Sequence, residues 1–180
     1  MASTIQVDKI QDTGGNTILS STSTGTFTYA AASGANFTNL SGVGKILQVV
    51  SQNIGTTVTN NTSTYADTGV TVDITPSATS SKILVIATIN GVVKVSGNSG
   101  TGFIGILLRD ASTLSLAYSG HNGVSDNVYM STVTYGYVDS PSSTSALTYK
   151  VQFKNNYNGA GVKVNSDSAD SSIVCMEIGA

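Results

Sequence analysis

Residues 82–89, Lys-Ile-Leu-Val-Ile-Ala-Thr-Ile, contain the longest apolar run in the chain and end at Asn90-Gly91. In an extended strand the odd-numbered residues make one apolar face, and Leu84 and Ile86 make the second face apolar as well. A β-branched run of this length, bounded by turn residues, is typical of a central strand and not of a helix. We expect both faces of this strand to be covered.

Short strands are also predicted along the rest of the chain after residue 44. The clearest alternation places Leu147, Tyr149, Val151 and Phe153 on an inward face, and a hairpin is expected around Asp110-Ala111-Ser112. The other strands are expected at residues 45–51, 65–75, 103–109, 113–118, 128–138, 162–165 and 172–178.

About nine short strands without helical periodicity predict an all-β chain, an antiparallel β-sandwich of the jelly-roll type. An immunoglobulin-like sandwich is the alternative. The chain has no Trp and a single Cys, so the residues that mark that fold are absent from the sequence.

The first 42 residues follow a different pattern. Ile5 and Val7 alternate with polar residues, and a turn at residues 12–16 leads to a return strand, which predicts a small extended β-ribbon. Residues 20–42 resemble a linker but contain spaced large side chains. We therefore predict an N-terminal anchor arm (residues 1–42) and a sandwich domain (residues 43–180). The arm residues expected to contact a partner are Ile5, Val7, Ile10, Ile18, Phe27, Tyr29 and Phe37.

The amino-acid composition supports the predicted all-β fold and indicates self-association. Charged residues make up 10% of the chain, against about 25% in average proteins. Ser and Thr together number 50, and the hydrophobic fraction of 39% argues against disorder. The apolar second faces of two strands exceed what a two-layer core requires, which indicates a subunit interface and, we expect, a homotrimer. The residues expected on this surplus face are Leu47, Val49, Leu84 and Ile86.

Charge and hydropathy exclude several classes of protein. A net charge of −2 and scattered basic residues provide no electrostatic footprint for nucleic acid. No apolar run approaches the length of a membrane span, and no signal peptide is recognised, so we expect a soluble chain made in the cytoplasm. Cys175 has no cysteine partner within the chain and is expected to be a buried thiol.

The sequence offers little catalytic or metal-binding chemistry. His121 is the only histidine, so a zinc site or a Ser/His/Asp triad lacks its usual residues. The aspartates Asp67, Asp110, Asp126, Asp139, Asp167 and Asp170 fall in or beside predicted turns, where such side chains commonly bind their own backbone.

Two loop motifs and three tyrosines are further candidates for ligand binding. Residues 167–170 contain two aspartates but lack the spacing of a calcium loop. The glycine-rich residues 97–102 precede a strand, not a helix, and lack the lysine of a phosphate-binding loop. Tyr129, Tyr135 and Tyr137 are expected to divide between core and surface, and an exposed one could stack on a sugar ring. We predict no enzyme, no cofactor and no metal site.

Several segments resemble virion structural proteins of tailed bacteriophages, particularly marine bacteriophages and cyanophages. The opening residues 3–12 with Gly14-Gly15-Asn16 resemble the N-terminal motif of proteins described as tail fibre or head decoration proteins. The segments that resemble their C-terminal domain are residues 44–52, 67–70, 74–76, 81–85, 140–141, 149–152 and 176–178. The similar segments are spread over most of the chain, and residues 96–135 are the least characteristic.

The resemblance implies a homotrimer that is fastened to the particle by its N-terminal arm, with a jelly-roll head projecting outward. The chain has no shaft repeats between arm and head, which favours a capsid decoration or cement protein on the virion surface, bound to the major capsid protein. The alternative is a short tail fibre or receptor-binding tip, bound to tail proteins and recognising a host surface glycan.

Overall fold

The structure is a computed structural model, and it describes residues 9–11, 17–20, 45–95, 97, 101–120, 127–156 and 160–179. The chain divides into two compact units, residues 1–41 and 42–180. In the first unit, β1 (Lys9–Gln11) and β2 (Thr17–Ser20) pair in antiparallel fashion, with Ile10 opposite Leu19. The predicted N-terminal ribbon is therefore present in the backbone.

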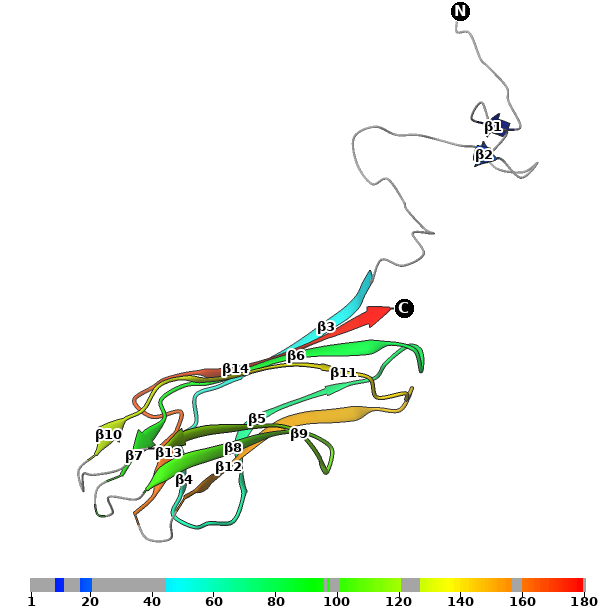
Figure 1. Cartoon of the computed structure of the whole chain (residues 1–180). Helices are drawn as coiled ribbons and strands as arrows, with labels where there is room; N and C mark the ends of the chain where they lie inside the picture. The colour runs from blue at the N-terminus through cyan, green and yellow to red at the C-terminus, as the bar shows by residue number, and fades with distance from the viewer. Residues whose placement is uncertain are drawn as a thin grey trace, which may run out of the picture. The chain divides into compact units, whose positions relative to one another are not determined.

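The second unit contains two four-stranded antiparallel sheets that lie one over the other (Figure 1). The first sheet has the order β11-β6-β14-β3, formed by Val133–Asp139, Lys82–Ile89, Ser171–Gly179 and Lys45–Ile54. The second sheet has the order β5-β12-β8-β9, formed by Ala66–Ile74, Leu147–Asn155, Gly102–Arg109 and Ser112–Gly120.

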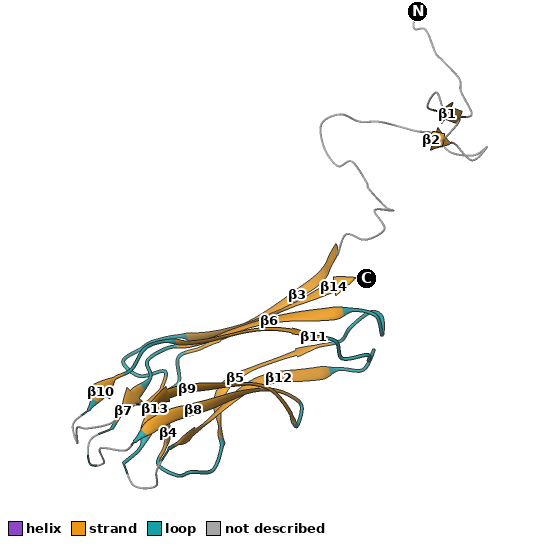
Figure 2. Ribbon diagram, viewed as in Figure 1, coloured by secondary structure: helices purple, strands orange, loops and turns teal. Residues whose placement is uncertain are grey.

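The strand order is that of a jelly roll. Apart from the β8–β9 hairpin, every connection between these eight strands crosses from one sheet to the other. The described residues form strands, turns and loops without a helix (Figure 2). The predicted all-β sandwich is confirmed, and so is the hairpin, which turns at Asp110 with a positive φ of 53°.

A small third sheet, the cap sheet, closes one end of the sandwich. Its order is β10-β7-β13-β4, formed by Val128–Tyr129, Val93–Lys94, Val162–Val164 and Val58–Asn60. Each of these strands lies in a connection between two long strands, so four crossovers pair with one another at the same end (Figure 1). We call this the capped end. At the opposite, open end β3 begins and β14 finishes, with Lys45 opposite Gly179.

Two sequence predictions about strands were wrong. Residues 128–138 were expected to form one strand, but the chain leaves the cap sheet after Tyr129 and joins the first sheet at Val133. Residues 92–95 were expected to continue the central strand, but β6 ends at Ile89 and Val93–Lys94 form the separate strand β7 of the cap sheet. The short strand β4 was not predicted. Both β4 and β7 are two or three residues long and are defined by pairing with distant β13, which local periodicity does not reveal.

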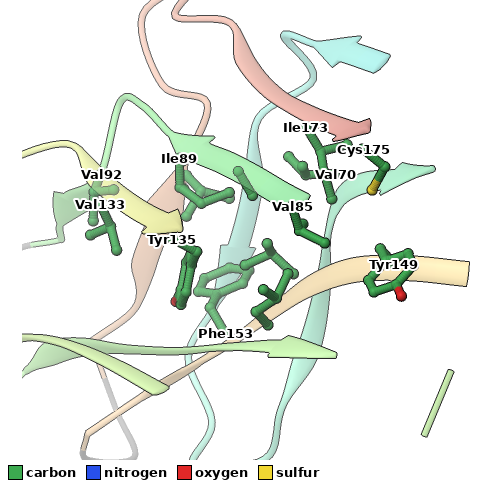
Figure 3. Close-up of a cluster of buried hydrophobic side chains, with 14 of the residues drawn as sticks. Val70, Val85, Ile89, Val92, Val133, Tyr135, Tyr149, Phe153, Ile173 and Cys175 are labelled. Atoms are coloured by element: carbon green, nitrogen blue, oxygen red, sulfur yellow. The ribbon is translucent and has the colours of Figure 1, made fainter. Parts of the chain in front are cut away.

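The core lies between the two long sheets, as the alternation along β6 and β12 predicts. Ile83, Val85, Ala87 and Ile89 are fully buried, and the inward residues of β12 meet them from the other sheet (Figure 3). The predictions for the inward residues of β12 and for a buried Cys175 are confirmed. Burial raises the pKa of the Cys175 thiol to about 12, which makes the thiol unreactive at neutral pH.

Gly105, in the middle of β8, makes room for a core tyrosine. A Cβ at residue 105 would collide with Tyr135 Oη and approach Phe103 Cζ to 2.5 Å. Among the described residues, Tyr135 Oη has no hydrogen-bond partner although Tyr135 is buried.

We therefore expect Gly105→Ala to lower the free energy of unfolding by about 2 kcal/mol through overpacking. Tyr135→Phe should be nearly neutral because it removes a hydroxyl that has no partner. The double variant should recover part of the loss, which urea unfolding of all four proteins measures. Strictly additive changes in unfolding free energy would contradict this account.

Candidate subunit interface

The outer face of the first sheet is apolar over the half nearest the open end. One row crosses all four strands in register and consists of Val138, Leu84, Met176 and Val49. The next row toward the capped end consists of Gly136, Ile86, Val174 and Ser51. We define the apolar face as these two rows' large side chains together with Ile46 and Ile178 at the open end.

The apolar face is solvent-exposed in the single chain. Ile46, Val49 and Val138 expose 58%, 55% and 53% of their surface, and Ile86 exposes 40%. Leu84 is partly buried. Of the four residues expected on the surplus face, Val49, Leu84 and Ile86 thus lie on this outer surface. The expectation for Leu47 was wrong, because its side chain lies against Gly179, on the face of β14 to which Glu177 belongs. Contiguous apolar patches of this extent are uncommon on monomers and usually mark a contact with another molecule.

The strand pattern explains why this face exists. The odd-numbered residues of β6 are fully buried in the core. Successive side chains of a strand point to opposite faces, so Leu84 and Ile86 point away from the core. In β3, Val49 and Ile46 point outward opposite Met176 and Ile178, while a register irregularity leaves Leu47 unpaired between them. An apolar face that the core does not need is consistent with burial against a partner.

Toward the capped end the same sheet face is polar but uncharged. Its next row consists of Thr134, Thr88, Ser172 and Asn53. Within the cross-strand rows of this face that are named above, one residue is charged. It is Lys82, which lies opposite Ile178 at the open end. Hydroxyl and amide groups can hydrogen-bond across a contact without the large desolvation cost of ions.

The outer face of the second sheet has a different character. Ile104, Ile106 and Leu108 point outward but are only 5–6% exposed. They lie beside the long side chains of β12, which stand opposite them in register. Leu116 and Tyr118 of the edge strand β9 remain exposed.

The charges on that face are paired with their neighbours. Lys150 Nζ lies 3.2 Å from Asp67 Oδ1, and Lys154 Nζ lies 4.8 Å from the centre of the Tyr65 ring. A shallow groove of about 290 Å³ is lined by Asp67, Gly69, Val70, Thr71, Thr148 and Lys150. Its carboxylate and ammonium groups bind each other, so the groove offers an ion pair and hydroxyl groups to solvent.

Glu177 forms a buried polar cluster at the open end, which sequence reasoning missed. Its Oε1 accepts hydrogen bonds from the Ser77 backbone N–H at 2.7 Å and from the hydroxyls of Ser77 and Ser81 at 2.6 and 2.7 Å. Its Oε2 accepts one from Gln48 Nε2 at 2.6 Å. Burial alone raises the pKa of Glu177, but these bonds outweigh it and lower the pKa from 4.5 to about 2.

The environment of Asp139 differs from the one expected from the sequence. It was expected to bind its own backbone in a turn, yet its Oδ2 accepts hydrogen bonds from Arg109 Nη1 at 2.7 Å and from Tyr149 Oη at 2.6 Å. The hydrogen bond to Asp139 raises the pKa of Arg109. Burial, and after it the hydrogen bond that Tyr149 itself donates to Asp139, raises the pKa of Tyr149. The cluster links β11 of the first sheet to β8 and β12 of the second.

The remaining candidate residues fall into three groups. Ile10 and Ile18 lie in β1 and β2, where only the backbone is described. Tyr135 is buried, Tyr137 is partly buried and Tyr129 is 72% exposed, so the expected division of the tyrosines is confirmed. The candidates outside the described residues are Ile5, Val7, Phe27, Tyr29, Phe37, His121 and Asp126.

Two classes of feature are absent from the described residues. His, Cys, Asp and Glu side chains nowhere gather in groups of three or more that could hold a metal ion. The described ranges also contain no helix that is long and apolar enough to span a membrane.

Comparisons with known proteins return likeness in structure alone. No family model matches the sequence, and no curated protein matches it. The chain is similar to dimeric latent PorU from Porphyromonas gingivalis, with 10% identity and a TM-score of 0.39 over 73% of this chain and 13% of PorU. It is also similar to VP2 in a subviral particle of infectious bursal disease virus, with 9% identity and a TM-score of 0.35 over 74% of this chain and 40% of that chain.

A structure of infectious bursal disease virus, strain Gx, gives a TM-score of 0.32 at 13% identity over 74% of this chain and 37% of that chain. The chain thus spans well under half the length of each of these proteins. At such identities and TM-scores the comparisons carry no argument about the fold or the function of this chain.

Proposed function

We propose that this protein is a structural component of a tailed-bacteriophage virion, a trimeric capsid decoration protein that binds the particle surface through its N-terminal arm. The observation that carries the proposal is the exposed apolar face of the first sheet, which needs a partner to be covered. The resemblance of the arm and head segments to phage virion proteins supports a phage particle as the partner to which the arm binds.

The charged groups support a structural role over a catalytic one. Both carboxylate oxygens of Glu177, and Oδ2 of Asp139, accept hydrogen bonds from donors of the same chain. A catalytic acid or base needs a free approach for its substrate, which these bonds obstruct. We therefore propose that the chain is not an enzyme.

The division of the chain supports a separate attachment role for the arm. The ribbon β1–β2 belongs to the first compact unit, whereas every long strand of the sandwich belongs to the second. A two-stranded ribbon is marginal by itself and gains stability by pairing with another sheet or protein surface.

The test is binding of the purified protein to phage particles that lack it, followed by electron microscopy. We expect the full chain to decorate the capsid, and a chain without residues 1–42 to keep its β-sheet circular dichroism spectrum but not to bind. A full-length variant with Ile5→Ser and Val7→Ser should bind at least about tenfold more weakly. Binding at the tail alone, or full binding without the arm, would contradict the proposal.

A second candidate function is a short tail fibre or receptor-binding tip. It is favoured by Tyr129 and Tyr118, which expose 72% and 64% of their surface and could stack on sugar rings. Binding to a glycan array that is lost in Tyr129→Ala, together with labelling at the tail, would select this function.

A further inference from the structure

The width of the first sheet limits how many copies can share its apolar face. Four strands about 4.8 Å apart make a wall roughly 19 Å wide. Three such walls around a common axis would each lie about 5.5 Å from that axis, while four walls would lie about 10 Å from it. The side-chain layer of one sheet fills about 5 Å, half the spacing of two packed sheets. Three copies therefore fill the centre, and four would leave a channel lined with apolar side chains.

We propose that three copies of this chain pack around a threefold axis with the outer face of the first sheet turned toward the axis, so that β3 of each copy lies against β11 of the next. The inference rests on the proposed function for the setting of a trimer and adds which surface forms it. Contacts around a threefold axis are heterologous, and the two edge strands of one sheet supply two different surfaces.

Exposure along the sheet agrees with this arrangement. On this face the edge strand β3 exposes Ile46 and Val49, and the edge strand β11 exposes Val138. In a ring these side chains meet at the boundary between neighbouring copies. Leu84 and Met176, on the two middle strands, would point at the axis itself.

Charge and area are also suitable for contact between copies. The two complete apolar rows contain no charged residue, and the adjoining Thr, Ser and Asn row can hydrogen-bond between copies. Nine residues of β14 at about 3.4 Å each make the wall roughly 30 Å long, which gives each copy about 580 Å² of flat area. That is of the order of the 800 Å² of accessible surface that one partner buries in a stable interface.

Cross-linking tests which strands meet. Val49 and Val138 lie at the two ends of one row, about 14 Å apart within a copy, so a shorter bismaleimide cannot join them there. In the proposed ring, residue 49 of one copy lies near residue 138 of the next. Cys175 is fully buried and should not react.

We expect the full-length double variant Val49→Cys, Val138→Cys to give covalent trimers on denaturing gels, and each single variant to stay monomeric on the gel. A product that stops at two chains would indicate face-to-face dimers, and a longer ladder would indicate an open chain. Either result, or no cross-linking, would overturn the proposal.

A charge at the axis provides the second test. Leu84→Lys places three ammonium groups together and should weaken association on the order of 100-fold, so that light scattering gives the 18.3 kDa of one chain in place of three times that mass. The matched control, Leu116→Lys, makes the same change at a residue that is 57% exposed on the other sheet and should remain trimeric.

A wild-type monomer, or a trimer that survives Leu84→Lys, would overturn the threefold contact. The outcome is separable from that of the proposed function. A trimer of this geometry found on the tail would reject capsid decoration but leave the threefold contact standing. A monomer that binds the capsid would reject the threefold contact but leave capsid decoration standing.

Discussion

Replacing Glu177 by Ala is expected to lower the free energy of unfolding by roughly 4 kcal/mol, because four donors lose at once the acceptor that this fully buried carboxylate provides. The donors are the Ser77 backbone N–H and hydroxyl, the Ser81 hydroxyl and Gln48 Nε2. These groups hold the connection between β5 and β6 against β14 and β3. Urea unfolding at pH 7 measures the loss.

Glu177→Gln separates the charge from the shape of the side chain. The amide keeps an acceptor for the serines but turns an NH₂ group toward Gln48, so a smaller loss of about 1–2 kcal/mol is expected. The two variants should therefore rank wild type, Gln, Ala in order of decreasing stability. Equal losses in both variants would mean that the charge alone, and not the set of hydrogen bonds, stabilises this end.

The same residue predicts a pH dependence. The folded-state pKa of Glu177, about 2, lies below the ordinary 4.5, so its contribution to stability is complete above pH 4.5 and is lost as the pH falls toward 2. The difference in unfolding free energy between wild type and Glu177→Gln should shrink over that interval. A difference that stays constant from pH 7 to pH 2 would contradict the depressed pKa.

The second large effect is expected at Asp139. Asp139→Ala should cost about 3 kcal/mol because it leaves Arg109 and Tyr149 Oη without their acceptor in a mostly buried setting. Arg109 keeps 24% of its side chain in solvent, which holds the cost below that of a fully buried pair.

A double-mutant cycle with Tyr149→Phe measures the coupling. Asp139→Ala should cost less in the Tyr149→Phe background, since one of its two donors is already absent. Asp139→Asn is the matched control, because it retains an acceptor of the same size and removes the charge. Additive losses for Asp139→Ala and Tyr149→Phe would show that the 2.6 Å bond contributes little to stability.

The long strands could be predicted because their periodicity is local. In β12 every second residue is buried, and in β6 the odd-numbered residues fill the core, as alternation requires. The strands β4 and β7 of the cap sheet could not be predicted, since a pair such as Lys94 and Val162 forms between residues far apart in the sequence.

The polar clusters were missed for a different reason. Because Asp139 falls beside a predicted turn, it was expected to bind its own backbone. The alternation along β11 instead places Asp139 on the core side of the sheet, together with Tyr135. The alternation of Ile173, Cys175 and Glu177 likewise marks the single glutamate of the chain as inward-facing. A charged residue at a core position of a regular strand was the available signal for a buried hydrogen-bonded carboxylate.

The start of β3 and the end of β14 lie together at the open end, which matters for any use of this protein to display cargo. Lys45, where β3 begins, is paired with Gly179, where β14 finishes. A protein fused to the C-terminus would thus follow β14 at the open end, beside the apolar face through which we propose that copies meet. Cargo that must stay clear of that contact belongs instead in one of the crossovers of the capped end, about 30 Å away along the nine residues of β14.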